Sequence, residues 1–402
     1  MLTSMTTLAA PHQTMRFSEA VRWIGFFLLS VYAVGFSKYW LGFDDLVGPG
    51  GQPFGHDFYC FWTASKLVLS GNLETVLNPE AFQLALDNGL PGQVAIYPWN
   101  YPPTYLLIVT PLALLPLWLS YFVFMGGTFA AFYWALRRFF PRPEVLWLLL
   151  LSGIPSMNMA YGQNGFLTAA LMAVALKAVL DRQVIIAGLA LGLLTFKPHL
   201  GLLIPVALLA ARQYKMILSA ALSTFGFAAL AALAFGPEAW MAFFNATFSM
   251  SGTVAEGGLP WWHQPTVYGM MRGMGFDGLT GTLVQGGVSL AMVAMIWQVW
   301  RKSVSPIGVA ILMPASILAS PYLLVYDLMA MSICAIVWAR LAIENDNWRP
   351  YERFVLMASI VGSILLALGA QHGVVQLTPF ALAATLPFLW LRHQDQQSTS
   401  YA

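Results

Sequence analysis

Asp57 heads the segment whose residue types are best suited to chemistry. It precedes a half-apolar run that ends at Ser70 and Gly71. A carboxylate fixed at a surface can act as a general base. An Asp directly before an apolar run is also a common helix N-cap residue, although Cys60, three residues later, supplies no capping box. Both interpretations stay open, and they are compatible because a cap would hold the carboxylate still.

Lys197 and His199 flank Pro198 inside an apolar stretch. A buried cation near a break in a helix suits the phosphate of a lipid, but a lysine there can also extend its charge to the membrane surface. His263 and Arg272 are two further candidate phosphate ligands. Because no polybasic cluster and no Walker, dinucleotide, HExxH or CxxC pattern occurs, we expect a ligand with one phosphate, no nucleotide and no cofactor.

Further polar and aromatic residues occur at turns and loops that we expect on the same side, and they form the candidate substrate-binding set. The set is Tyr59, Tyr101, Gln163, Asn164, Trp261, Trp262, Tyr322, Tyr326 and Asp327. Aromatic belts are normal at membrane interfaces, yet rings beside carboxylates also suit the C–H faces of sugars. For the two loops together we favour a carbohydrate site. Asp327 near the end of a span has two interpretations, a functional carboxylate or a partner of the neighbouring tyrosine.

The composition assigns these residues to a membrane protein. Of 402 residues, 58% are hydrophobic and 9% are charged, whereas soluble domains carry roughly 25% charged residues. Only helices satisfy every backbone group within an apolar segment of this kind. We therefore predict an all-α, polytopic helical bundle of about twelve transmembrane helices, with a range of about ten to thirteen.

The expected spans follow from the apolar runs. They are residues 19–40, 103–136, 145–160, 165–180, 184–196, 199–211, 216–235, 279–300, 306–320, 323–339, 354–370 and 374–391. Most Lys and Arg residues fall at alternate span ends, and only Lys38, Lys66, Lys197 and Arg272 fall at the others. By the positive-inside rule both termini are cytoplasmic.

One membrane domain, 1–402, is expected. Its parts are a cytoplasmic tail at 1–18, an outer loop at 41–102, a second outer loop at 236–278 and a cytoplasmic tail at 392–402. We expect short helices in both outer loops. The first loop also holds Asp44 and Asp45, which leave a divalent metal ion open as an alternative and which, with Asp327, are further candidates for the catalytic role.

Several short motifs follow one another between residues 57 and 322. They are Asp57-Phe58-Tyr59, Ala64, Ser70-Gly71, Tyr101-Pro102-Pro103, Pro111-Leu112-Ala113-Leu114-Leu115-Pro116, Gly162-Gln163-Asn164, Lys197-Pro198-His199 and Ser320-Pro321-Tyr322. In this order they resemble the multi-spanning GT-C glycosyltransferases, and within them glycosyltransferase family 87. That family contains the polyprenyl-phosphate-mannose-dependent mannosyltransferases of actinobacteria. The chain departs from the actinobacterial pattern after Pro321, where Tyr322 and Tyr326-Asp327 replace a His-bearing segment.

The resemblance implies transfer of a hexose from a polyprenyl-phosphate sugar to a hydroxyl of a lipid or glycan. Mannose is the hexose that it favours. It implies Asp57 as the base, Lys197 and Pro198 near the donor phosphate, and an active site that faces the periplasm from a bacterial inner membrane. Neither a nucleic acid nor a metal ion is expected as a partner. A transporter or flippase for a lipid-linked sugar is the alternative, because helices broken at prolines suit one. A structural membrane-assembly protein would need no acidic and aromatic outer face.

Overall fold

The fold is built from helices throughout the described part of the chain. The computed structural model describes residues 12–90, 99–255, 260–345, 347–370, 372–373 and 375–401. Within these ranges the regular elements are all helical, and β-pairing is limited to isolated bridges between Asp44 and Val47 and between Val47 and Pro53. The all-α prediction is therefore confirmed, as expected where the chain must satisfy its own backbone hydrogen bonds in lipid.

Four stretches of the described chain are long and apolar enough to cross a membrane. They are α6 (Leu117–Arg137), α12 (Tyr214–Phe235), α15 (Gly278–Trp300) and the continuous stretch Val325–Glu344, which joins η4 (Val325–Ala330) to α17 (Met331–Glu344). These helices identify a membrane protein, but they do not support the expected count of about twelve spans.

The shortfall arises because many apolar runs are divided into short helices. The run 145–160 breaks at Gly153, whose φ of 67° is left-handed, into α7 (Glu144–Leu151) and α8 (Ile154–Ala160). α10 (Val184–Leu194) has 11 residues, so at about 1.5 Å per residue it covers only about half of the hydrocarbon core. Apolar composition alone therefore overestimates the number of single helices that can span.

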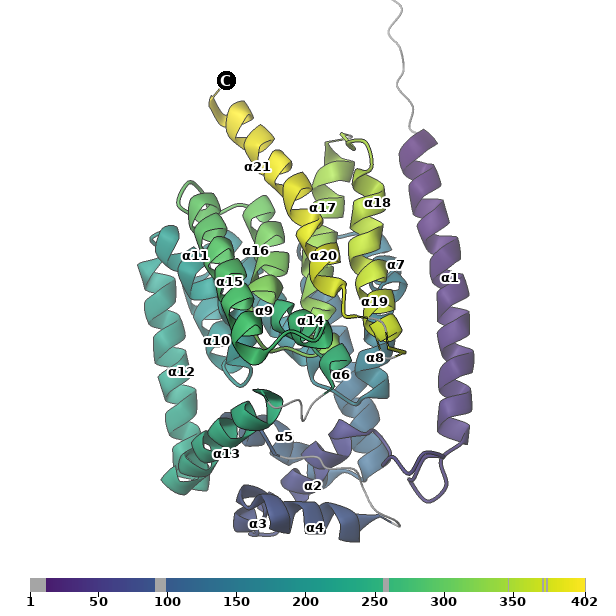
Figure 1. Cartoon of the computed structure of the whole chain (residues 1–402), viewed down its shortest axis with the longest axis vertical. Helices are drawn as coiled ribbons and strands as arrows, with labels where there is room; N and C mark the ends of the chain where they lie inside the picture. The colour runs from purple at the N-terminus through teal and green to yellow at the C-terminus, as the bar shows by residue number, and fades with distance from the viewer. Residues whose placement is uncertain are drawn as a thin grey trace, which may run out of the picture.

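The centre and the edges of the bundle differ in burial. In α16 (Pro306–Ala319) every residue from Ile307 onwards is buried, whereas α12 at one edge exposes many large apolar side chains (Figure 1). α10 packs closely on α12 because its Gly188 has no side chain: a Cβ there would lie 2.0 Å from Ser219 Oγ. Small residues of this kind let helices approach in membranes.

The helices of the first predicted outer loop lie at one end of the molecule (Figure 1). The first loop contains α2 (Asp57–Leu69), α3 (Leu73–Leu77) and α4 (Pro79–Gly89), and the second contains α13 (Pro237–Ala255), η3 (Trp261–His263) and α14 (Val267–Gly273). α13 lies toward the same end, whereas α14 lies at mid-height of the bundle (Figure 1). α1 (His12–Leu41) runs along the edge of the bundle, and its first residues and the chain's C-terminus lie at the opposite end (Figure 1). The remaining elements are α5 (Pro103–Val109), η1 (Thr110–Leu114), α9 (Gly165–Leu180), η2 (Pro198–Gly201), α11 (Ile204–Ala210), α18 (Glu352–Met357), η5 (Ala358–Gly362), α19 (Ser363–Ala370), α20 (Thr378–Ala383) and α21 (Thr385–Tyr401).

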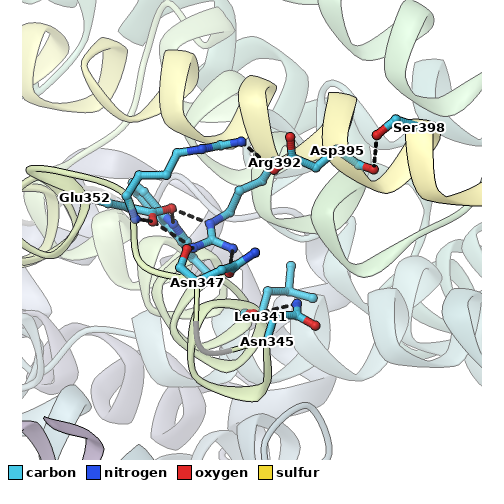
Figure 2. A network of polar contacts seen from close by, with 9 residues as sticks. Leu341, Asn345, Asn347, Glu352, Arg392, Asp395 and Ser398 are labelled. Atoms are coloured by element: carbon cyan, nitrogen blue, oxygen red, sulfur yellow. Dashed lines mark hydrogen bonds and ion pairs between the residues drawn. The ribbon is translucent and has the colours of Figure 1, made fainter. Parts of the chain in front are cut away.

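A buried ion pair fastens the last helix at that opposite end. Figure 2 shows the Arg392 guanidinium of α21 reaching Glu352 at the start of α18 and Asn347 before it. Arg392 Nη2 lies 2.7 Å from Glu352 Oε2, and Trp338 Nε1 donates to Glu352 Oε1 at 2.7 Å. The Glu352 carboxylate is thus fully committed to structure, and α21 continues as a helix to Tyr401, within the predicted tail at 392–402.

Candidate active site

Asp57 is the first residue of α2, and its backbone is fixed from another part of the chain. Its N–H donates to Tyr161 O at 3.1 Å. His56, with φ 47°, occupies the N-cap position and makes no capping hydrogen bond through its side chain. The Asp57 carboxylate instead accepts a hydrogen bond from the side-chain amide of Gln163. The N-cap alternative is therefore wrong: Asp57 lies one residue inside the helix, and its carboxylate points to a different partner.

Burial changes the acidity of Asp57. Desolvation by the surrounding protein raises the pKa of its carboxyl group from 3.8 to about 6, although the Gln163 hydrogen bond and the Lys197 charge both act to lower it. A carboxylate with such a pKa is ionised at neutral pH yet basic enough to accept a proton usefully. Strong perturbation by burial together with a named charge partner is typical of functional sites.

Gln163 is itself held by two donors. Its Oε1 accepts from the Tyr101 hydroxyl and from the backbone N–H of Asn164, each at 3.3 Å. Three of the candidate residues, Tyr101, Gln163 and Asn164, thus meet beside Asp57. The turn that carries them needs Gly162, with φ 59°, because a Cβ there would lie 1.9 Å from Gly55 O.

The second part of the site is an ion pair between Lys197 and Asp327. Lys197 is 6% exposed, and its Nζ lies 2.8 Å from Asp327 Oδ1 and 4.8 Å from the centre of the Tyr326 ring. His199 Nε2 lies 3.8 Å from Asp327 Oδ2, and the His199 ring meets the Tyr322 ring edge-on at 5.7 Å. In the structure these residues lie together, and Asp327 pairs with Lys197 rather than with its neighbour Tyr326.

Tyr161 connects the separate parts of the site. Its ring lies 5.9 Å from His56, 6.1 Å from His263 and 6.5 Å from Tyr326, measured between ring centres. The second outer loop therefore reaches the site through His263, whose pKa burial lowers to about 4. The imidazole is neutral at pH 7, so His263 brings no positive charge.

The comparison with known families decides the class of protein. The model of Glycosyltransferase family 87 matches residues 99–325, which is more than half of the chain. The chain belongs to glycosyltransferase family 87. No curated protein and no solved structure matches it.

Membership of family 87 makes the chain a glycosyltransferase, which uses a sugar donor and an acceptor, and so favours the enzyme over the transporter and the assembly protein. The matched residues include Tyr101, Gln163 and Lys197 but neither Asp57 nor Asp327. The interpretation of these two carboxylates rests on their geometry.

The other candidate site residues of this glycosyltransferase contact groups other than Asp57 and Lys197. The Tyr59 hydroxyl donates to Leu86 O at 2.8 Å, which fastens α2 to α4. The Arg272 guanidinium lies 5.1 Å from the Trp261 ring. Trp262 touches His263 ring to ring at 3.6 Å between centres, and its carbonyl accepts from Gln376 Nε2 at 2.9 Å. The Tyr59 hydroxyl is thus bonded within the protein, and Arg272 and Trp261 contact each other.

Asp44 and Asp45 lie on a separate turn between α1 and α2. Asp44 is bridged to Val47 there, and the turn borders an open cavity with Gly42 and Pro49. Among the described residues, no three His, Cys, Asp or Glu side chains gather closely enough to hold a metal ion. Neither of these carboxylates takes part in the hydrogen bonds of Asp57 and Lys197 described above.

The sequence did not single out Tyr161 or His56, although both border Asp57 in the structure. The available signal was their adjacency to motifs: Tyr161 directly precedes Gly162-Gln163-Asn164, and His56 directly precedes Asp57. A turn that requires Gly162 also fixes the direction of the residue before it.

Proposed function

We propose that this glycosyltransferase moves a hexose from a polyprenyl-phosphate sugar to a hydroxyl of a lipid or glycan, with inversion at the anomeric carbon. Mannose is the hexose that we favour. The observation that carries the proposal is the Asp57 carboxylate, oriented by Gln163, near enough to buried Lys197 to be influenced by its charge. A base and a cation are thus available in one partly enclosed site.

In the proposed reaction, the acceptor oxygen attacks the anomeric carbon while Asp57 accepts the hydroxyl proton. The bond between the anomeric carbon and the phosphate oxygen breaks, and its electron pair leaves with the polyprenyl phosphate. A positioned base of this kind contributes roughly 10²–10⁴-fold to the rate. Direct displacement inverts the anomeric centre.

Lys197 and His199 are the proposed ligands of the donor phosphate. Lys197 keeps two ammonium protons beyond the one directed at Asp327, since its NH₃⁺ group has three donors. His199 Nε2 is buried without a hydrogen-bond partner. Fixed cations and donors in a dry site stabilise a charge that develops on the leaving group. Arg272 and His263 are the weaker candidates, because one contacts Trp261 and the other is neutral.

The membrane setting completes the proposal. We place the enzyme in a bacterial inner membrane, with both termini cytoplasmic and the α2 end facing the periplasm. The positive-inside rule supports this orientation, as does the position of the first residues of α1 and of the C-terminus at one end (Figure 1). The donor's polyprenyl tail would lie along the apolar helices.

Sugar transfer by the purified protein tests the proposal. Wild type and Asp57→Asn are compared in detergent with labelled polyprenyl-phosphate mannose and a membrane-lipid extract. The substitution keeps the size of the side chain and removes the base, so we expect label transfer by wild type and a loss of at least about 10²-fold in the variant. Equal transfer by both would reject Asp57 as the base, and no transfer by wild type from any polyprenyl-phosphate sugar would reject the donor class.

A further inference from the structure

We propose that Gln163 is a positioning residue that keeps Asp57 ionised and aimed, and that Tyr101 and the Asn164 backbone in turn fix the orientation of Gln163. The proposal concerns how the base is prepared and rests on the proposed function only for its kinetic consequence. Gln163 was expected to bind substrate, but its side-chain amide forms hydrogen bonds with Asp57, Tyr101 and the Asn164 backbone.

The orientation of the Gln163 amide follows from its neighbours. A backbone N–H can only donate, so the Asn164 N–H, 3.3 Å away, requires the amide oxygen on its side. The Tyr101 hydroxyl supplies a second donor to the same oxygen at 3.3 Å. The NH₂ group must then face Asp57, where it can only donate. A flipped amide would place its oxygen against a carboxylate and leave the Asn164 N–H without an acceptor.

A fixed donor has a defined electrostatic effect on Asp57. Hydrogen bonding to the charged form of a carboxylate favours that form, and Gln163 is 4% exposed, so water does not replace it easily. The backbone of Asp57 is held separately by Tyr161 O. Asp57 is thus held at two points, because its backbone N–H bonds to Tyr161 O and one carboxylate oxygen accepts from Gln163. The other carboxylate oxygen, to which no described residue donates, is available for a proton.

Other ionisable groups surround Asp57. The Lys197 charge acts on Asp57, and the Asp57 charge acts in turn on the hydroxyls of Tyr101, Tyr105, Tyr161, Tyr322 and Tyr326 and on the Cys60 thiol of its own helix. Tyrosine hydroxyls and thiols ordinarily titrate well above pH 7. Burial lowers the pKa of the adjacent His56, and His199 lies beside Asp327. Because an imidazole contributes no carboxyl band, the infrared band of the Asp57 carboxyl group, rather than a pH–activity profile alone, identifies the titration of Asp57.

The experiment measures the protonation of Asp57 directly. Infrared difference spectra of the full-length protein in detergent are recorded against pH, and Asp57→Asn identifies the Asp57 carboxyl band. The variants are Gln163→Met, which keeps the length of the side chain without a donor, Gln163→Glu, and Tyr101→Phe. We expect the Asp57 midpoint to rise by about one pH unit in Gln163→Met, further in Gln163→Glu, and less in Tyr101→Phe.

Gln285→Met is the matched control. Gln285 is also a buried glutamine, and its side chain bonds to the Tyr268 N–H, the Leu318 carbonyl and the Ser289 hydroxyl, none of them an acid. This variant should melt at a lower temperature without moving the Asp57 midpoint, which separates a loss of packing from a loss of the amide donor.

The kinetic measurement adds the consequence for transfer. In Gln163→Met the acid limb of kcat/KM, which reports the free enzyme, should move to higher pH by the same amount, whereas the loss that remains on the alkaline plateau reports misalignment of the base. An unchanged infrared midpoint in Gln163→Met would overturn the positioning role whatever the activity. If the midpoint shifts in Gln163→Met while the wild type transfers no sugar, the positioning role is supported and the proposed function is rejected. The two failures are therefore distinguishable.

Discussion

At the scale of single residues, the two central carboxylates have opposite surroundings. Within the described part of the chain Asp57 has one side-chain amide donor and no ion-pair partner in direct contact, and burial raises its pKa to about 6. Asp327 receives Lys197 Nζ on one oxygen and the Leu324 N–H, at 3.0 Å, on the other. One carboxylate is therefore prepared to take a proton and the other to hold a cation, which is how environments divide the roles of acids in one site.

The raised pKa of Asp57 predicts a stability cost at neutral pH. The folded protein binds this proton more tightly than the unfolded chain, so stability falls as pH rises from about 4 to about 6. At 1.36 kcal/mol per unit the cost at pH 7 is at most about 3 kcal/mol. Asp57→Asn carries no charge to desolvate and should melt at a higher temperature than wild type at pH 7.

Thermal unfolding in detergent at pH 7 and at pH 4 checks this prediction. The gain should disappear at pH 4, where the wild-type carboxyl group is largely protonated. A variant that is less stable than wild type at pH 7 would show that the carboxylate stabilises the fold instead.

At the scale of elements, the Lys197–Asp327 pair joins the start of η2 to η4. The partners are 130 residues apart in the chain and both are buried. α10 ends at Leu194, and Pro198 begins η2 with Lys197 at its N-cap position. Because Asp327 also accepts from the Leu324 N–H, one carboxylate orders the segment that carries Tyr322 and Tyr326.

Removing one partner of this pair should be costly. Asp327→Asn leaves Lys197 buried without a counter-charge, for which the expected loss is about 3–5 kcal/mol. The double variant Lys197→Met with Asp327→Leu buries no charge and should recover a large part of that loss. Melting temperatures of Lys197→Met, Asp327→Leu and the double variant, taken as a double-mutant cycle, provide the measurement. A single Asp327→Asn variant that melts like wild type would contradict the buried-pair interpretation.

At the scale of the whole molecule, the two ends of the bundle hold different polar groups. The end with α2, α3 and α4 carries the candidate site, and the other end carries the Glu352–Arg392 pair and the C-terminal helix (Figures 1 and 2). Edge helices such as α12 expose apolar side chains, as expected of a surface whose solvent is lipid. Among the described residues, only the four long apolar stretches meet both the length and the apolar composition of a span.

The proposed orientation predicts which introduced thiols an impermeant reagent reaches. Glu80→Cys on α4 should be labelled in intact spheroplasts, and Arg301→Cys, after α15, only once the membrane is opened. Both positions are exposed, and the native Cys60 and Cys334 are buried, so background labelling should be low. Labelling of Arg301→Cys but not of Glu80→Cys in intact spheroplasts would reverse the topology.

Composition and short motifs by themselves determined the class of this protein. A chain with 9% charged residues must be a helical membrane protein, because it has too few charges to cover a soluble surface. The ordered motifs led to family 87, and Asp57, Gln163, Lys197 and Asp327 could be selected because polar residues are conspicuous among apolar ones. These inferences depend on residue type and local spacing, which a sequence records.

The tertiary structure decided which of these residues act on one another. Gln163 reaches Asp57 across 106 positions and Asp327 reaches Lys197 across 130, and no local pattern specifies pairings at such separations. The pKa of Asp57, the commitment of Tyr59 to Leu86 and the division of apolar runs into short helices likewise depend on packing. Burial and long-range contacts set the chemistry of each group, and they exist only once the chain is folded.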